Sequence, residues 1–234
     1  MIKMVVSSFY NTLINEEEAI ASSTMLEIDR LRNKGIIFCV CTNRLSQEIL
    51  DYNRDLPFID YIISLNGNCI YEVESGKYFS KNKLSCSNIK KVSTIFKDSK
   101  IYYYTEKNVY EKLDDILEED IYKIEVEIEE DKEREKLGKL NVNSSIFTWQ
   151  EKKYLEIVSS RSSMFSGVDQ VSLKLDISLN EIVSIGANES DYSLIKNIEK
   201  SYIMKNSCPI LKKVTKRVTK SNNEKGVEMV LKKL

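Results

Sequence analysis

The opening of the chain constrains the fold more than any other stretch. Residues Ile2 to Val6 form a short apolar run rich in β-branched side chains, which is typical of a buried strand. The run then changes to small polar residues, Ser7 to Thr12, before a helical pattern begins. Because open α/β sheets bind ligands at the carboxyl edge of their strands, the residues after this strand are the first candidates for a functional site.

A second strand is expected beside the first. Apolar residues recur at roughly helical spacing from Glu16 to Lys34, and Gly35 is a natural helix stop. The apolar run from Ile36 to Cys41 follows, so this part of the chain predicts a β-α-β unit with parallel strands. The loop from Thr42 to Arg44 would then lie at the carboxyl end of the second strand, close to the loop after the first.

Composition excludes several kinds of function. The 234 residues include no histidine, which removes the commonest general base and the commonest metal ligand. The five cysteines are an odd number without metal-ligand spacing, so we expect reduced thiols that are mostly buried. A net charge of −1 gives no reason to expect nucleic acid as a partner, and no apolar run approaches the roughly 20 residues of a membrane span. We therefore expect a cytoplasmic protein that binds neither nucleic acid nor membrane.

The middle of the chain predicts a different kind of structure. Short strands and helices follow one another between Cys69 and Val158 in an order that indicates an α+β segment with an antiparallel sheet. The acidic stretch Glu125 to Glu135 and the basic run Lys212 to Lys220 are both predicted to be solvated faces, the basic one with helical spacing. Four aromatic residues of the segment either line a ligand pocket or pack within the sheet: Tyr102, Tyr103, Tyr104 and Trp149.

Motifs along the whole chain resemble the Cof-type branch of the haloacid dehalogenase (HAD) superfamily, a branch of sugar-phosphate phosphatases. The first strand of that family runs into the pattern DxDGTL, which here reads SFYNTL over residues 8–13. Its second motif, a Ser or Thr usually followed by Gly and Arg, here reads Thr42, Asn43 and Arg44. Its fourth motif, GDxxND, reads GANESD over residues 186–191, and residues 221–227 are similar to its SNDEDGV segment.

The resemblance implies an α/β fold in two parts. A HAD-like Rossmannoid core, with a parallel sheet flanked by helices, would comprise residues 1–66 and 167–234. An inserted α+β cap domain would comprise residues 67–166. In the family that this chain resembles, the cap covers the active site and supplies substrate specificity.

The catalytic residues of that family are replaced in this chain. Ser8 stands in place of the aspartate nucleophile, and Tyr10 in place of the aspartate that works as general acid and base. Met164 takes the place of the lysine that neutralises the phosphate, with Arg161 close enough to be considered as its substitute. Ala187 takes the place of a Mg²⁺ ligand. A serine hydroxyl has a high pKa, and no histidine is present to take its proton, so we expect no catalytic residue at these positions.

Losing these groups together should abolish the chemistry of the family. Enzymes accelerate phosphate-ester hydrolysis by up to ~10²¹, almost entirely through positioning and charge stabilisation. Removal of a nucleophile alone costs on the order of 10⁶ in rate. Mg²⁺ needs carboxylates to offset its dehydration, and Asp191 is the carboxylate retained at the ligand positions. We therefore expect no bound metal or other cofactor, and no phosphatase activity by the familiar route.

The same loops can still bind a ligand. Backbone N–H groups at strand ends and helix N-termini attract anions without the help of charged side chains. The small polar residues there either surround such an anion or serve as turn formers and caps, and Thr42 in particular is a possible N-cap of the next helix. The candidate ligand-binding residues are Ser8, Tyr10, Asn11, Thr12, Thr42, Asn43, Asn188 and Asp191.

Three functions remain open at this point. The first, which we favour, is a pseudoenzyme that binds a small phosphorylated or other anionic metabolite, or a protein partner that the sequence does not identify. The second is a phosphoric monoester hydrolase with an altered mechanism, in which Asp191 and Glu189 hold a metal and water is the nucleophile. The third is a cap that serves as a platform for protein interaction, which a contiguous exposed apolar patch would support.

Overall fold

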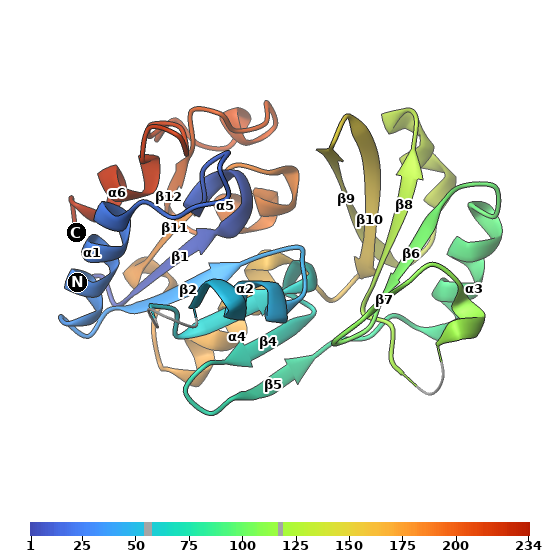
Figure 1. Ribbon diagram of the computed structural model, residues 1–234, viewed down its shortest axis with the longest axis horizontal. Helices are drawn as coiled ribbons and strands as arrows, with labels where there is room; N and C mark the ends of the chain where they lie inside the picture. Colours follow the sequence, from blue (N-terminus) through green and yellow to red (C-terminus); the bar gives the residue numbers. More distant parts are fainter. Residues whose placement is uncertain (54–57, 117–118) are drawn as a thin grey trace.

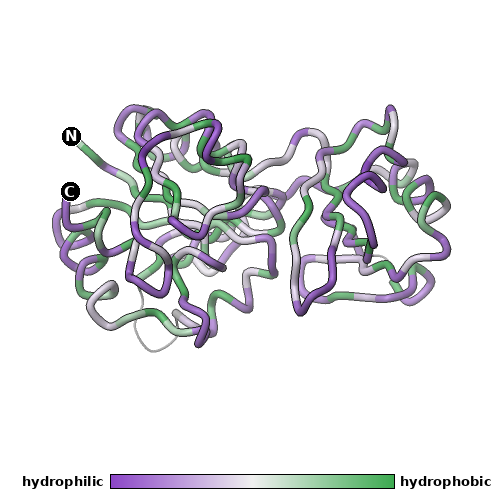
Figure 2. The backbone as a smooth tube through the Cα atoms, turned by 90° about the horizontal axis from the view of Figure 1, so that it is seen from above, coloured by the Kyte–Doolittle hydropathy of each residue, from purple (hydrophilic) through white to green (hydrophobic). Residues whose placement is uncertain are grey.

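The computed structural model describes residues 1–53, 58–116 and 119–234 and shows two lobes (Figure 1). Both termini lie on the larger lobe, at the end that faces away from the smaller one. Figure 2 views the molecule from above and shows that a narrow waist of chain connects the lobes. A seven-stranded sheet forms the centre of the larger lobe, and a five-stranded sheet forms the centre of the smaller one.

The larger sheet is parallel over five of its seven strands. In order across the sheet, its strands are β12 (Lys200–Ile203), β11 (Ile182–Gly186), β1 (Met4–Ser8), β2 (Ile37–Cys41), β3 (Tyr61–Ser64), β4 (Cys69–Glu72) and β5 (Lys77–Lys81). Strands β12 to β3 are parallel to their neighbours, whereas β4 and β5 are antiparallel. The loops after β1, β2 and β11 therefore meet at one edge, as the β-α-β pattern predicts.

Helices cover both faces of this sheet, which confirms the predicted α/β fold class. Helices α1 (Ser22–Arg32), α2 (Ser46–Asn53) and α6 (Gly226–Leu231) pack on the face to which Val5 and Phe38 point. Helices α4 (Met164–Lys174) and α5 (Tyr192–Asn197) pack on the opposite face, against Met4 and Cys39. Because both faces are buried, the strands read as continuous apolar runs. No helix of the described residues has the length and apolar character that crossing a membrane requires.

The smaller lobe is an antiparallel sheet with helices on one side. Its strands, in order across the sheet, are β7 (Val109–Tyr110), β6 (Ile101–Tyr104), β8 (Lys123–Ile128), β10 (Lys152–Ser159) and β9 (Val142–Trp149). Helix α3 (Cys86–Ile95) and the 3₁₀ helix η4 (Asp131–Leu137) cover one face and bury Ile124, Val126 and Leu155. The other face is turned toward the larger lobe (Figure 1).

The sheets divide the chain at positions other than residues 66 and 167. Strands β4 and β5, which fall within the expected 67–166 insert, pair with β3 and extend the larger sheet. The tight turn at Asn66 and Gly67, both with positive φ, sends the chain back beside β3 before it leaves the lobe. Helix α4 already begins at Met164. We therefore propose a core of residues 1–81 and 164–234 and a cap of residues 82–163, and these two names are used below.

Two predicted helices differ from the structure. The first begins at Ser22 rather than Glu16, because the side chain of Asn15 accepts hydrogen bonds from the backbone N–H groups of residues 17 and 19 and forms a turn there. The run Lys212 to Lys220 is not a helix beyond the 3₁₀ turn Leu211–Lys213. Its Val218 instead forms a β-bridge with Ile203 of the edge strand β12, so the segment covers that edge.

Candidate functional site

A cleft of about 630 Å³ lies between the carboxyl edge of the core sheet and the cap. Its walls come from both lobes. The core loops contribute polar and charged residues, and cap strands β9 and β10 contribute aromatic residues and a lysine. The lining residues used below are Tyr10, Asn11, Asn43, Arg44, Asn188 and Glu189 of the core and Asp131, Phe147, Trp149 and Lys153 of the cap.

The loop after β1 places its candidate residues at two different depths. Ser8 ends the strand and is 3% exposed. Asn11 has left-handed backbone (φ 60°), which a short polar side chain tolerates, and this turn leaves Tyr10 and Asn11 on the cleft wall. Thr12 is buried again, and its Oγ1 has no hydrogen-bond partner among the described residues. Two of the four candidates in this loop therefore line the cleft.

Two asparagine side chains join the loops after β1 and β11. The Nδ2 group of Asn11 donates to Oδ1 of Asn188 at 2.9 Å, and the Nδ2 group of Asn188 donates to the backbone carbonyl of Tyr10 at 3.0 Å. These bonds brace the floor of the cleft. One N–H of each amide is thereby used within the protein, and each amide keeps another N–H that can turn toward a ligand.

Asp191 supports the loop after β11 from below the cleft. It is fully buried, and its Oδ2 accepts hydrogen bonds from the backbone N–H groups of Ala187 and Asn188, both at 2.8 Å. A Cβ at Gly186 would lie 2.8 Å from the Asp191 carboxylate, so the glycine permits this close approach. Burial raises the pKa of Asp191 to about 6, although the two N–H donors and the Ser8 hydroxyl act in the opposite direction.

The loop after β2 turns its middle residues toward the cap. Thr42 is buried, and its Oγ1 accepts a hydrogen bond from the backbone N–H of Arg44 at 3.0 Å. This bond forms a tight turn, and because α2 begins only at Ser46, Thr42 is not its N-cap. Asn43 and Arg44 project from the turn into the space under the cap, where the Nδ2 group of Asn43 donates to Glu156 Oε1 at 2.8 Å.

The residue in place of the family lysine lies in the core rather than in the cleft. Met164 is 1% exposed and packs among the apolar side chains between α4 and the sheet. The chain is held there by Gly67, where a Cβ would lie 2.0 Å from the carbonyl oxygen of Ser163. Arg161 is exposed and borders a different hollow, beside Cys86, so it does not replace the missing cation.

Tyr10 is not suited to move protons at neutral pH. It is half-buried, and its hydroxyl donates to Glu48 Oε2 at 3.3 Å. Burial and the nearby Glu48 carboxylate raise the pKa of Tyr10 well above its ordinary value. The hydroxyl therefore stays protonated and acts as a hydrogen-bond donor.

The groups at the Mg²⁺ positions of the resembled family do not fit a divalent cation. Ser8 offers a hydroxyl and Ala187 a methyl group, while Asp191 already uses one oxygen for two backbone N–H groups. The side chain of Glu189, which the second hypothesis paired with Asp191, instead forms an ion pair with Arg134 of the cap. In the described parts of the chain, no three His, Cys, Asp or Glu side chains are grouped to hold a metal ion.

Arg44 is the prominent cation of the cleft. Its guanidinium carbon lies 5.6 Å from the ring centroid of Trp149 and 5.9 Å from that of Phe147, both on β9. Burial acts to lower the pKa of Arg44, but the Glu125 carboxylate outweighs it together with other nearby groups, so the pKa is raised. Arg44 forms no ion pair within 4.0 Å among the residues that the structure describes. Lys153 on the cap side is paired with Asp131 at 2.8 Å.

Of the eight candidate ligand-binding residues, the cleft brings together Tyr10, Asn11, Asn43 and Asn188. The other four are buried and do not line it: Ser8, Thr12, Thr42 and Asp191. Sequence reasoning did not place Phe147 or Lys153 at the site. Alternation along β9 is a signal for Phe147, which pairs with Tyr154 on the face toward the core. Lys153 has the opposite parity on β10, with Leu155 of the helix-covered face, so strand alternation does not place it at the cleft.

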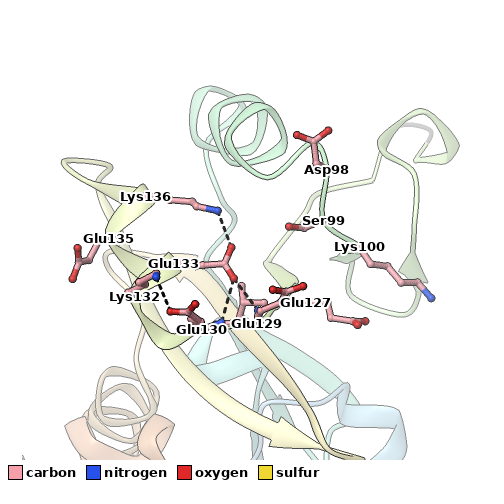
Figure 3. Close-up of a pocket in the computed structure, with 11 residues that line it drawn as sticks. Asp98, Ser99, Lys100, Glu127, Glu129, Glu130, Lys132, Glu133, Glu135 and Lys136 are labelled. Atoms are coloured by element: carbon pink, nitrogen blue, oxygen red, sulfur yellow. Dashed lines mark hydrogen bonds and ion pairs between the residues drawn. The ribbon is translucent and has the colours of Figure 1, made fainter.

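Another hollow, of about 690 Å³, lies on the cap among the ends of α3 and β8 and the helix η4. It is lined by six acidic and three basic side chains, several of which pair with one another (Figure 3). Glu133 pairs with Lys136 at 2.7 Å and Glu130 with Lys132 at 2.7 Å. The core contributes no lining residue to this hollow, so we place the functional site in the cleft at the strand edge.

Known proteins resemble this chain along its length. A sequence profile of the haloacid dehalogenase-like hydrolases matches residues 9–114 and 97–231. A 5-amino-6-(5-phospho-D-ribitylamino)uracil phosphatase of Bacillus subtilis, YcsE, is 22% identical over 232 residues, which cover 97% of this chain and 93% of that protein.

Solved structures share the fold. A haloacid dehalogenase-like hydrolase from B. subtilis superposes with a TM-score of 0.90 at 16% identity, covering 100% of both chains. A HAD subclass IIB sugar phosphatase superposes with a TM-score of 0.86 at 18% identity, covering 99% of this chain and 98% of that one. The resemblance found in the sequence motifs is therefore confirmed, and this chain belongs to the haloacid dehalogenase-like hydrolases, in their Cof-type branch.

Proposed function

We propose that the cleft between core and cap binds a small phosphorylated metabolite. The half-buried guanidinium of Arg44 is the observation that carries this proposal, because it forms no ion pair within 4.0 Å among the described residues and is a ready partner for a phosphate. The relatives support the same ligand class. One is named for a phosphorylated ribitylaminouracil, and one solved structure is a sugar phosphatase.

The remaining walls suit a small polar ligand. The volume of about 630 Å³ falls within the usual range for small-molecule sites. Asn11 and Asn188 line the same cleft as Arg44, and the second N–H of each amide is available to the ligand. The rings of Phe147 and Trp149 offer an apolar surface to the unphosphorylated part of the ligand.

Hydrolysis of that ligand is the second candidate, and the names of the relatives favour it over binding alone. The structural feature on its side is Ser8 next to the buried carboxyl of Asp191, whose pKa of about 6 suits a proton acceptor near neutral pH. Against the familiar route stand the absent aspartate nucleophile, the absent lysine and the unsuitable metal ligands. A pseudoenzyme and a hydrolase of altered mechanism therefore share one ligand class and differ in turnover.

Binding is tested by thermal shift with a panel of sugar phosphates and phosphorylated ring compounds. A ligand at 100 times its dissociation constant stabilises the folded state by about 2.7 kcal/mol, which raises the melting temperature by several degrees. We expect Arg44→Gln to remove that rise, whereas Arg161→Gln, which changes an exposed arginine outside the cleft, leaves it intact. A shift that survives in Arg44→Gln would place the ligand elsewhere.

Turnover is tested with the same panel and released phosphate as the readout, in the presence of Mg²⁺, Mn²⁺ or Co²⁺. Release that is abolished by both Ser8→Ala and Asp191→Asn would establish the hydrolase. Ligand binding without release in the wild-type protein would establish the pseudoenzyme. Neither binding nor release across the panel would contradict the proposed ligand class.

A further inference from the structure

The cap buries a set of charged side chains where its sheet faces the core. Lys123 and Glu125 alternate along β8, and Glu156 lies on the neighbouring strand β10. All three are buried, with exposed fractions of 0%, 3% and 1%. The expectation that the acidic stretch from Glu125 is a solvated face is therefore wrong at its first residue, because the core covers this face of the sheet.

Within the cap these charges almost satisfy one another. Glu125 and Glu156 stand directly opposite across β8 and β10, an arrangement that repels unless a cation lies between them. The ammonium of Lys123 lies there and donates to Oε1 of each carboxylate. Tyr104 donates to the other oxygen of Glu125 at 2.6 Å, and Ser145 donates to the other oxygen of Glu156 at 2.9 Å.

Asn43 of the core completes the set. The third N–H of the Lys123 ammonium donates to the backbone carbonyl of Asn43, and the side-chain amide of Asn43 donates to Glu156 at 2.8 Å. Both hydrogen bonds cross from core to cap and are partly buried. A buried ammonium has three donors to satisfy, so withdrawal of the cap would leave one of them without its protein partner.

Apolar side chains close the interface around these bonds. Leu45, Leu65 and Cys69 of the core form one buried cluster with Tyr104 and Tyr122 of the cap. The ring of Tyr104 also lies 3.8 Å from the Lys123 ammonium, measured to its centroid. The charged set is therefore enclosed on the core side as well as on the cap side.

We propose that Asn43 is a latch residue that holds the cap closed on the core in the absence of ligand. The side chain that makes the latch stands where the resembled motif usually has glycine, which has no amide to offer to Glu156. The closed arrangement is then the resting state of this protein. Access to the cleft requires the Asn43 bonds to Lys123 and Glu156 to break, a consequence that rests on the proposed function of the cleft.

The latch is tested without any ligand, so its failure is distinct from failure of the proposed function. Trp149 is the single tryptophan of the chain and lies on the cap against Arg44 of the core. Acrylamide quenching of its fluorescence therefore reports cap opening. The radius of gyration from small-angle X-ray scattering reports opening independently of the local environment of Trp149.

We expect Asn43→Gly to increase the ratio of open to closed molecules about tenfold, since it removes the side-chain hydrogen bond to the charged Glu156 and keeps the backbone carbonyl that accepts from Lys123. Quenching and radius of gyration should both rise, and Glu156→Gln should give a smaller rise of both. The matched control is Glu127→Gln, which breaks an ion pair with Lys152 within the cap. The proposal is overturned if Asn43→Gly is folded by circular dichroism and both readouts equal those of the wild-type protein and of Glu127→Gln.

Discussion

The floor of the cleft and the cap face above it differ in the charged side chains that they carry. On the floor, positions that carry carboxylates and a lysine in the resembled motifs hold Ser8, Met164 and Ala187, and two of these side chains are packed as ordinary core. On the cap face, Lys123, Glu125 and Glu156 are buried together and bonded to the core. The charged residues of the resembled motifs are absent from one surface, while buried charges bonded across the interface are present on the other.

The two surfaces also differ in how fully their charged groups are paired with protein partners. A catalytic site keeps charges incompletely paired, so that they are available to a reacting group. The cap face pairs each of its charges and uses nearly every donor, so little is left for a ligand. Asp191 is paired in part: its Oδ2 accepts hydrogen bonds from two backbone N–H groups, whereas its buried Oδ1 has no hydrogen-bond partner among the described residues. Arg44, between the two surfaces, is the charge to which we assign the proposed ligand.

The largest change in the free energy of unfolding is expected from substitutions on the cap face. Lys123→Met leaves two opposed carboxylates buried without their cation, and breaking a buried pair in this way costs about 3–5 kcal/mol of the free energy of unfolding. Urea denaturation measures the loss. The triple variant Lys123→Met, Glu125→Gln, Glu156→Gln removes the charges together and should recover most of it. Equal losses in the single and triple variants would show that packing, rather than charge, holds this interface.

A smaller change is expected from a substitution at the floor of the cleft, and at neutral pH this substitution should stabilise the protein. The pKa of Asp191 in the folded protein is about 6, above its ordinary value of 3.8, so the folded state binds this proton more tightly than the unfolded chain. Stability from this group is therefore present at low pH and is lost as the pH rises through about 4 to 6. In the Asp191→Asn variant, the amide would keep an oxygen acceptor for the two backbone N–H groups without the buried charge.

Asp191→Asn should accordingly match the wild-type protein near pH 4 and exceed it in stability by up to about 3 kcal/mol at pH 7, from a shift of about two pKa units. Urea denaturation at several pH values measures the difference. A difference that stays constant with pH would mean that Asp191 titrates in the folded protein as it does in the unfolded chain. The floor would then hold an ordinary surface-like carboxylate, and the contrast with the cap face would weaken.

The parallel strands are predictable because a strand that is buried on both faces has a continuous run of apolar residues in the sequence. Strands β1 and β2 are predicted in this way, and the parallel β-α-β order places the loops after them at one edge. Strand β12, Lys200–Ile203, was missed because it is a short strand with a mixed polar and apolar sequence. Its pairing with β11 and the bridge to Val218 are long-range contacts, which the local sequence does not predict.

The sequence predicts at which edge of the sheet the site lies, but not which of its side chains are buried and which face the cleft. Topology alone puts Ser8, Thr42 and Asp191 at the carboxyl edge of the sheet. Whether such a side chain faces the cleft or the interior depends on one backbone angle, as the left-handed turn at Asn11 shows. The burial of the charged set on the cap depends on the loop at Asn43, which lies 80 residues before Lys123 in the chain. Alternation within a strand identifies a polar face but does not say what covers it.

The smallest effect concerns a second contact between the lobes, the ion pair of Arg134 in η4 with Glu189 in the loop after β11. Their side chains are 36% and 26% exposed, unlike the buried set around Lys123. A partly exposed pair of this kind contributes about 0.2–1 kcal/mol and is screened by salt. Glu189→Gln should therefore open the cap slightly at low ionic strength, by the Trp149 and scattering readouts, and have no effect in about 1 M salt. If Glu189→Gln opens the cap as far as Asn43→Gly does, closure depends on the exposed rim as much as on the buried latch.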